Sequence, residues 1–237
     1  MKSRTIIFTG GTGLLGSEFR KIAPEFLYPS AGEFDVTNYP QMEKYAETHG
    51  CDQVIHAAAF TSPPQVDKNP AKALDVNIVG TANVVKLCIK FGARLVYICT
   101  DYVFQGDKGG YTETDAVNPV NKYAWSKLGG ECAARMYDKS LIVRTTFSPD
   151  RFPYDRAFSD QWTSREPVSV SARKLAALAG TDAVGVVHVG GERRTVLEYA
   201  RSLDPSRPIG SLSIKDVPFK VPIDTSLNCE RYKSIIH

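Results

Sequence analysis

Residues 4–23, RTIIFTGGTGLLGSEFRKIA, give the clearest indication of the fold. It begins as a short β-rich run and ends with the apolar spacing of a helix. Between these parts, Gly10, Gly13 and Gly16 have the spacing G-x-x-G-x-x-G. A glycine loop in this place lets a pyrophosphate approach the backbone, and the amino end of the helix favours its negative charge. The stretch therefore predicts a dinucleotide-binding unit.

The alternation of strand and helix continues along the chain. Further strands are expected at residues 26–29, 52–59, 93–100 and 140–146, and helices at residues 38–50, 73–92 and 121–138. Continuous apolar strands that helices separate are typical of a parallel sheet with both faces covered. We therefore predict an α/β fold, a Rossmann-type doubly wound parallel sheet with a small C-terminal substrate-binding lobe.

The pattern is looser after residue 146. Helices are expected at residues 153–166, 173–180 and 195–203, a strand at residues 185–191, and an irregular chain from Pro205. We place the dinucleotide-binding Rossmann core at residues 1–146. Residues 147–237 are expected to form a small substrate-binding lobe that is interleaved with the core.

Size and charge exclude several classes of function. The chain has 237 residues, 43% of them hydrophobic, which is enough for a core and a small lobe. A net charge of +3 gives no reason to expect nucleic acid or an anionic membrane as a partner. No apolar run approaches the roughly 20 residues that span a bilayer, and the first residues lack the apolar core of a signal peptide. We therefore expect a cytoplasmic protein with no nucleic-acid or membrane partner.

The cysteines and histidines form no metal or disulfide pattern. The five cysteines are scattered and odd in number, which indicates buried reduced thiols. Neither the cysteines nor the four histidines have the spacing of metal ligands. The sequence therefore predicts no metal site.

The glycine loop resembles that of the extended short-chain dehydrogenase/reductase family. That resemblance implies a Tyr-x-x-x-Lys pair on a later helix, and Tyr123 and Lys127 of YAWSK (residues 123–127) form such a pair. Residues four apart on a helix share a face. Thr100 ends a predicted strand, where open parallel sheets bind ligands. The resemblance implies that Tyr123, Lys127 and Thr100 are the catalytic residues.

These three residue types suit the reduction of a ketone. A free tyrosine titrates at about pH 10, and a nearby ammonium group lowers that pKa. We expect Tyr123 to donate a proton to the carbonyl oxygen and Thr100 to bind the same oxygen. Lys127 is expected to tune Tyr123 and to hold the nicotinamide ribose.

Later motifs resemble the dTDP-4-dehydrorhamnose reductases. The most specific are CTDYVFQG (residues 99–106) and the segment that ends in YAWSK, and HAAAFTSPPQVDKNP (residues 56–70) adds to them. The resemblance covers nearly the whole chain. It implies reduction of the 4-keto group of a nucleotide-linked 4-keto-6-deoxysugar by NADPH or NADH.

The same resemblance implies two sets of binding residues. The cofactor set is Gly10, Gly13, Leu14, Leu15, Gly16, Asp35, Val36, Ala58, Ala59, Thr61, Asn77, Ile98, Tyr123 and Lys127. The substrate set is Thr100, Asp101 and Phe147. Ser30, with Arg20 or Lys21, is expected to accept a 2′-phosphate, which favours NADPH while NADH is tolerated.

The chain departs from the family pattern where a substrate would bind. Pro63 and Pro64 lengthen a loop, and Phe147 replaces a tryptophan. Arginine binds phosphates well. The candidates to hold a diphosphate are Arg144, Arg151, Arg156, Arg165, Arg193 and Arg194.

Two other functions remain open at the level of sequence. An epimerase would use the same three catalytic residues and would retain NAD. The regulatory β subunit of methionine adenosyltransferase has this fold and acts as a binding partner. A dehydratase is disfavoured, because Tyr102 stands where those enzymes have a second carboxylate after Asp101. We also consider a homodimer.

Overall fold

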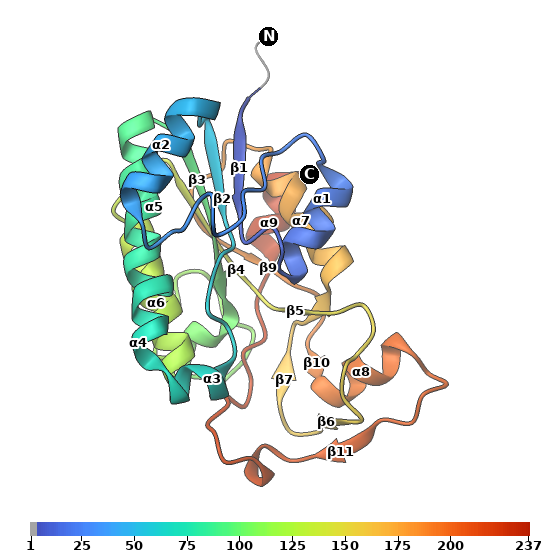
Figure 1. Ribbon diagram of the computed structural model, residues 1–237. Coiled ribbons are helices and arrows are strands. Elements are labelled where there is room, and N and C mark those ends of the chain that lie inside the picture. Colours follow the sequence, from blue (N-terminus) through green and yellow to red (C-terminus); the bar gives the residue numbers. More distant parts are fainter. Residues whose placement is uncertain (1–3) are drawn as a thin grey trace.

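The computed structural model describes residues 4–237, and a parallel sheet of five strands lies at its centre (Figure 1). In order across the sheet, the strands are β1 (Ile6–Thr9), β2 (Gln53–His56), β3 (Arg94–Thr100), β4 (Ser140–Thr145) and β9 (Gly185–Val189). Every neighbouring pair is parallel. Nearly all residues of these strands are buried, as expected of a sheet covered on both faces. The predicted Rossmann-type α/β fold is confirmed.

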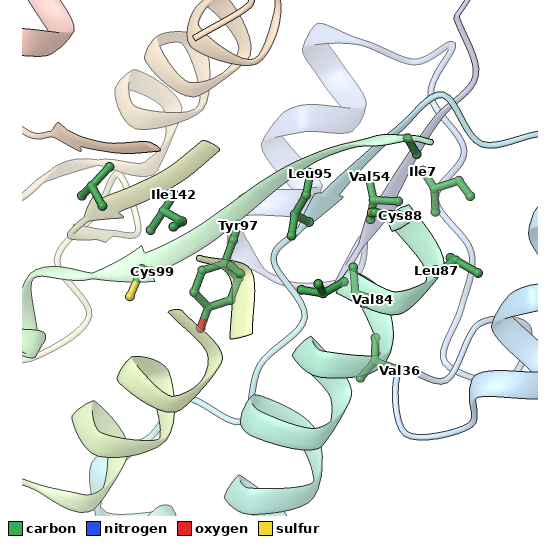
Figure 2. Close-up of a cluster of buried hydrophobic side chains, with 14 of the residues drawn as sticks. Ile7, Val36, Val54, Val84, Leu87, Cys88, Leu95, Tyr97, Cys99 and Ile142 are labelled. Carbon is green, nitrogen blue, oxygen red and sulfur yellow. The ribbon is translucent and has the colours of Figure 1, made fainter. Parts of the chain in front are cut away.

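Helices cover both faces of the sheet (Figure 1). One face carries α2 (Tyr39–His49), α5 (Gly80–Phe91) and α6 (Lys122–Ala134), and the other carries α1 (Leu14–Ile22), α7 (Val168–Ala179) and α9 (Glu230–Ile236). Figure 2 shows the apolar cluster on the first face, where the Tyr97 hydroxyl points toward a helix. That hydroxyl donates to the Lys127 carbonyl at 2.9 Å, so the cluster also ties α6 to β3.

The predicted helix at residues 73–92 is composite. It starts with α4 (Pro70–Ala73), continues as the π-helical turn η1 (Leu74–Val79) and becomes α5, which ends at Gly92. The loop expected before it contains α3 (Pro63–Lys68), because two prolines are compatible with a first helical turn. Single π turns occur often at functional sites.

The predicted strand at residues 26–29 is wrong. Only Leu27 bridges to β1, through Leu27 N to Ile6 O at 2.9 Å and Phe8 N to Leu27 O at 2.8 Å. Pro29 has no N–H group, so it cannot extend this pairing. Leu27 and β2 lie on opposite sides of β1, which makes β1 the point where the order of the sheet reverses. Such points are where open α/β sheets bind ligands.

The predicted helix at residues 153–166 is also wrong. The region forms three short strands, β6 (Arg156–Phe158), β7 (Trp162–Thr163) and β8 (Glu166–Pro167). Their partners are β11 (Gly210–Leu212), β10 (Arg194–Thr195) and β5 (Phe147–Ser148), respectively. Pairing with other segments of the chain therefore overrides the local helical spacing.

The remaining elements complete the region after residue 146. The helix α8 (Val196–Leu203) begins with a capping box between Thr195 and Glu198. The short 3₁₀ turns are η2 (Asp101–Val103) and η3 (Ile214–Asp216). The segment expected to be irregular contains α9 near its end. Strand β9 and helix α7 belong to the central layers, whereas β6, β7, β10, β11 and α8 gather at one end (Figure 1). The division at residue 147 stays a prediction.

Candidate active site

A cleft of about 700 Å³ lies at the carboxyl ends of the central strands. The glycine loop lines one end of it, and Phe147 and Arg165 line the other. Thr100, Tyr123 and Lys127 lie among its lining residues. A second hollow of about 740 Å³ opens at the amino ends of the strands and contains none of the predicted site residues. The predicted residues therefore gather in one cleft.

The backbone of the glycine loop can hold only glycine at two positions. Gly10 has a φ of +77°, and a Cβ there would lie 2.8 Å from Ala58 N. A Cβ on Gly16 would lie 2.5 Å from Gly10 O. Gly13 is the N-cap of α1 and has no side chain to cap the helix. The bare amino end of α1 thus faces a cradle that fits the pyrophosphate of a dinucleotide.

Most of the predicted cofactor residues line this cleft. They are Gly10, Gly13, Leu14, Leu15, Asp35, Val36, Ala58, Ala59, Thr61, Ile98, Tyr123 and Lys127. Gly16 lies behind the loop, where it allows α1 to approach Gly10. Asn77 also lies behind the lining. Its side chain accepts from Phe60 N at 2.8 Å and donates to Ser126 Oγ at 2.8 Å, so it ties the loop after β2 to α6.

A chain of buried hydrogen bonds supports the same loop. His56 Nδ1 lies 2.8 Å from Thr9 Oγ1, and His56 Nε2 lies 3.0 Å from Thr81 Oγ1. Thr81 donates its proton to the Asn77 carbonyl, so His56 Nε2 donates to Thr81 and Nδ1 accepts from Thr9. Thr9 also accepts from Ala58 N at 3.2 Å. Burial lowers the pKa of His56 to about 3, which keeps the ring neutral.

Thr100 and Tyr123 meet near the middle of the cleft. Thr100 accepts from Tyr102 N at 3.2 Å and donates to Asp101 Oδ1 at 3.1 Å. Burial raises the pKa of Tyr123 above its usual value, and the nearby Thr100 hydroxyl opposes that rise only in part. The phenol therefore stays protonated at neutral pH. In the chain by itself, burial outweighs the lowering expected from Lys127.

Lys127 is almost fully buried, with 3% of its surface exposed. Its Nζ lies 4.4 Å from the centre of the Tyr97 ring. Burial lowers the pKa of Lys127 to about 8, while the negative charge of Glu131 acts in the opposite direction. The side chain therefore keeps a positive charge at neutral pH in most molecules.

A buried ion pair anchors α6 beneath the predicted pair. Arg144, which is 1% exposed, donates from Nη2 to Glu131 Oε1 at 2.7 Å and from Nε to Glu131 Oε2 at 3.1 Å. Burial would raise the pKa of Glu131, but the hydrogen bonds and charge of Arg144 lower it below its usual value. Arg144 is thus a structural residue and not free to hold a diphosphate. Sequence reasoning missed Glu131, although it follows Lys127 by one helical turn.

Asp101 joins the cleft to the C-terminal segment. Its carboxylate is 1% exposed and accepts from Thr100 and from Thr225 Oγ1 at 2.5 Å. Burial raises the pKa of Asp101 to about 6, against the opposing effects of Thr225 and the Arg165 charge. Thr225 was not predicted, since 124 residues separate it from Asp101.

The described residues form neither a metal cluster nor a bilayer-spanning helix. Within residues 4–237, no three His, Cys, Asp or Glu side chains cluster as a metal site would require. The described part of the chain also contains no helix that is long and apolar enough to cross a bilayer.

One family model and several named proteins match this chain. The family model "RmlD substrate binding domain" matches residues 4–177. The dTDP-4-dehydrorhamnose reductase of Mycobacterium tuberculosis is 35% identical over 156 residues, which are 62% of this chain and 51% of that protein. The chain thus spans about half the length of the first curated relatives it matches.

Two other similarities extend over nearly the whole chain. Methionine adenosyltransferase 2 subunit beta of Rattus norvegicus is 33% identical over 98% of this chain and 83% of its own length. The crystal structure of dTDP-4-dehydrorhamnose reductase from Bacillus anthracis, in complex with NADP, has a TM-score of 0.88 and 25% identity. That match covers 99% of this chain and 92% of the other.

Proposed function

The chain belongs to the RmlD substrate binding domain family, and from this premise we propose that it is an NADPH- or NADH-dependent sugar-nucleotide reductase. Its substrate would be the 4-keto group of a nucleotide-linked 4-keto-6-deoxysugar. The observation that carries this proposal is the single cleft that joins a glycine cradle to Thr100, Tyr123 and Lys127.

Tyr123 is the proton donor in this reaction. When bound, a reduced nicotinamide would supply the hydride for the carbonyl carbon. Tyr123 gives its phenolic proton to the carbonyl oxygen, and the raised pKa of Tyr123 keeps that proton available at neutral pH. Lys127 holds the nicotinamide ribose through its buried ammonium group and offsets the negative charge that forms on Tyr123.

Thr100 has a second partner before it binds substrate. Its hydroxyl donates to Asp101, so binding the ketone oxygen requires that hydroxyl to turn from the carboxylate toward the cleft. Asp101 keeps its bond from Thr225 during that change. Phe147 lines the substrate end of the same cleft and would pack against the sugar.

The choice between NADPH and NADH would depend on residues beside Tyr28. Arg20 donates from Nε to Gly11 O and from Nη2 to Tyr28 O, both at 3.1 Å, and its guanidinium lies 4.5 Å from the Tyr28 ring centre. Lys21 instead pairs with Glu18 at 2.6 Å. We therefore assign the 2′-phosphate of NADPH to Arg20 and not to Lys21.

Ser30 also lines the cleft near this position. Its N–H and hydroxyl both donate to Glu33, and these bonds lower the pKa of Glu33. The Glu33 carboxylate thus competes with a phosphate for Ser30, so NADH should also be accepted. Replacing Arg20 by Met should raise the KM for NADPH about tenfold more than the KM for NADH, while Lys21→Met should change neither.

The reductase proposal is tested by NADPH consumption. The chain is given dTDP-4-keto-6-deoxyglucose with and without a 3,5-epimerase, so that both ketones are offered. We expect turnover, and Tyr123→Phe should lower it by about 10²- to 10⁴-fold without changing the melting temperature. Absence of turnover with either ketone, in a protein that binds NADPH, would exclude this substrate.

A second candidate function rests on the match to the rat β subunit. In that case the chain would be a non-catalytic, NADP-binding regulatory subunit. A stable complex with a methionine adenosyltransferase catalytic subunit, without ketone turnover, would support it. The presence of Thr100, Tyr123 and Lys127 in one cleft favours the reductase, because a scaffold has no need of them. NAD that stays bound through purification would instead favour an epimerase.

The homodimer and the cytoplasmic location stay predictions. Light scattering of the purified chain tests the first, and cell fractionation tests the second.

A further inference from the structure

The six arginines that the sequence suggests as diphosphate ligands lie in different surroundings in the structure. Only one of them, Arg165, lines the cleft that contains Thr100 and Tyr123. Arg144 is buried against Glu131, and Arg193 pairs with Asp224 at 2.8 Å. The others lie outside the cleft lining: Arg151, Arg156 and Arg194.

Arg165 stands on the lobe side of the cleft. Its backbone N–H donates to Thr163 Oγ1 at 3.1 Å, which fixes the start of the side chain. The guanidinium lies near the Tyr102 hydroxyl, where its positive charge opposes the rise that burial causes in the pKa of Tyr102, and that hydroxyl accepts from Gln161 Nε2 at 2.9 Å. The side chain is therefore fixed at its backbone and lies beside Tyr102, and it is half-buried.

The guanidinium of Arg165 has donors without partners. Its Nε is buried and makes no hydrogen bond, and no ion pair among residues 4–237 involves Arg165. The Asp101 carboxylate lies near enough to feel its charge but accepts hydrogen bonds from Thr100 and Thr225. A buried cationic donor without an acceptor is costly, and a bound anion would remove that cost.

We propose that Arg165 binds the diphosphate of the nucleotide-linked substrate. The glycine cradle at the other end of the cleft is left for the pyrophosphate of the cofactor. A planar guanidinium matches two phosphate oxygens at once, which a lysine cannot do. This inference rests on the proposed function for the sugar, but the binding of a nucleoside diphosphate can be measured without any turnover.

The experiment is a calorimetric titration of the full chain with dTDP, UDP and inorganic pyrophosphate. Saturating NADP⁺ is present, so that the glycine cradle is already filled. Arg165→Met should weaken dTDP binding about 10- to 100-fold. Arg165→Lys should weaken it less, because lysine keeps the positive charge but cannot donate two parallel hydrogen bonds to the phosphates. The matched control is Arg151→Met, an exposed arginine outside the cleft, which should bind dTDP like the wild type.

The affinity for NADP⁺ separates a local effect from misfolding. Arg165→Met should bind NADP⁺ as tightly as the wild type, and Arg165→Lys provides a second variant if the first does not fold. The inference is overturned if Arg165→Met retains wild-type affinity for dTDP and UDP, or if the wild type binds neither in the presence of NADP⁺. Binding that depends on Arg165 without ketone reduction would support the inference while excluding the proposed reductase.

Discussion

The two walls of the cleft are built in different ways. The sheet wall carries the glycine loop, Thr100, Tyr123 and Lys127, and it stands on five paired strands and α6. The lobe wall carries Phe147 and Arg165, and it stands on strands of two or three residues. The predicted catalytic residues thus lie on the wall that the larger sheet and α6 support. A reaction centre needs fixed geometry, whereas a wall that selects a substrate can vary between relatives.

The contacts behind each wall also differ in burial. Glu131 and Arg144, behind the sheet wall, are 0% and 1% exposed. Behind the lobe wall, the Arg193 side chain is 49% exposed where it pairs with Asp224 and lies 3.9 Å over the Trp162 ring. Breaking the two pairs should therefore have unequal effects on the whole molecule.

The largest effect is expected for Glu131→Ala. It leaves the Arg144 guanidinium buried without its carboxylate, which should lower the free energy of unfolding by about 3–5 kcal/mol in urea titrations. Arg135→Ala is the control, because Arg135 contacts the same carboxylate but is 48% exposed. That variant should lose about 1 kcal/mol or less. Equal losses in the two variants would contradict the special role of the buried pair.

A pH-dependent effect is expected where the two walls meet. Burial raises the pKa of Asp101 from 3.8 to about 6, so the folded chain favours the protonated carboxyl. The stability contributed by this group is therefore present below about pH 4 and is lost as the pH rises through about 6. Between pH 4 and 7, the wild type should lose about 2.4 kcal/mol of unfolding free energy relative to Asp101→Asn. A difference that does not change with pH would rule out this assignment.

A substitution at Gly16 probes the backbone of the glycine loop, which belongs to the sheet wall of the cleft. A Cβ at Gly16 would contact Gly10 O at 2.5 Å and the Gly11 backbone, and neither can move without shifting the loop. Gly16→Ala should cost about 1–3 kcal/mol of stability and weaken NADPH binding, measured by fluorescence titration. At Gly32 the nearest atom to a Cβ is Ser30 Oγ at 3.7 Å, so Gly32→Ala is the control. Unchanged NADPH affinity in Gly16→Ala would place the cofactor elsewhere.

The smallest effect on the whole molecule is expected for Arg193→Ala. Its half-exposed pair with Asp224 should contribute about 1 kcal/mol or less to global stability. Asp224 keeps its bonds from Ser226 N–H and Oγ, so the segment should loosen without detaching. Hydrogen exchange should rise at the Thr225 amide, which donates to Trp162 O, and stay unchanged in β3. If Arg193→Ala lowers the free energy of unfolding as much as Glu131→Ala does, the two walls do not differ in their contribution to stability.

The short lobe strands mark where prediction from sequence fails. Residues 153–166 have helical spacing, yet their pairing is decided by β5, β10 and β11 in other parts of the chain. The strand expected at residues 26–29 shrinks to Leu27, because a run of four residues with a proline has little to pair with. The first outcome cannot be read from local spacing, because the deciding contacts are distant, whereas the proline that shortens the second pairing is visible in the sequence.

The central sheet, the glycine loop and the helix that carries Tyr123 and Lys127 can be predicted from the sequence alone. Those features depend on periodicity, helix caps and backbone freedom, which act between neighbours in the chain. The folded chain is needed to see that Arg144 pairs with Glu131, that Thr225 contacts Asp101, and that Arg165 lines the cleft. A charged side chain has the same local signature on a surface, in an ion pair or in a cleft. Its role is fixed by burial and by which partner the fold brings within hydrogen-bond distance.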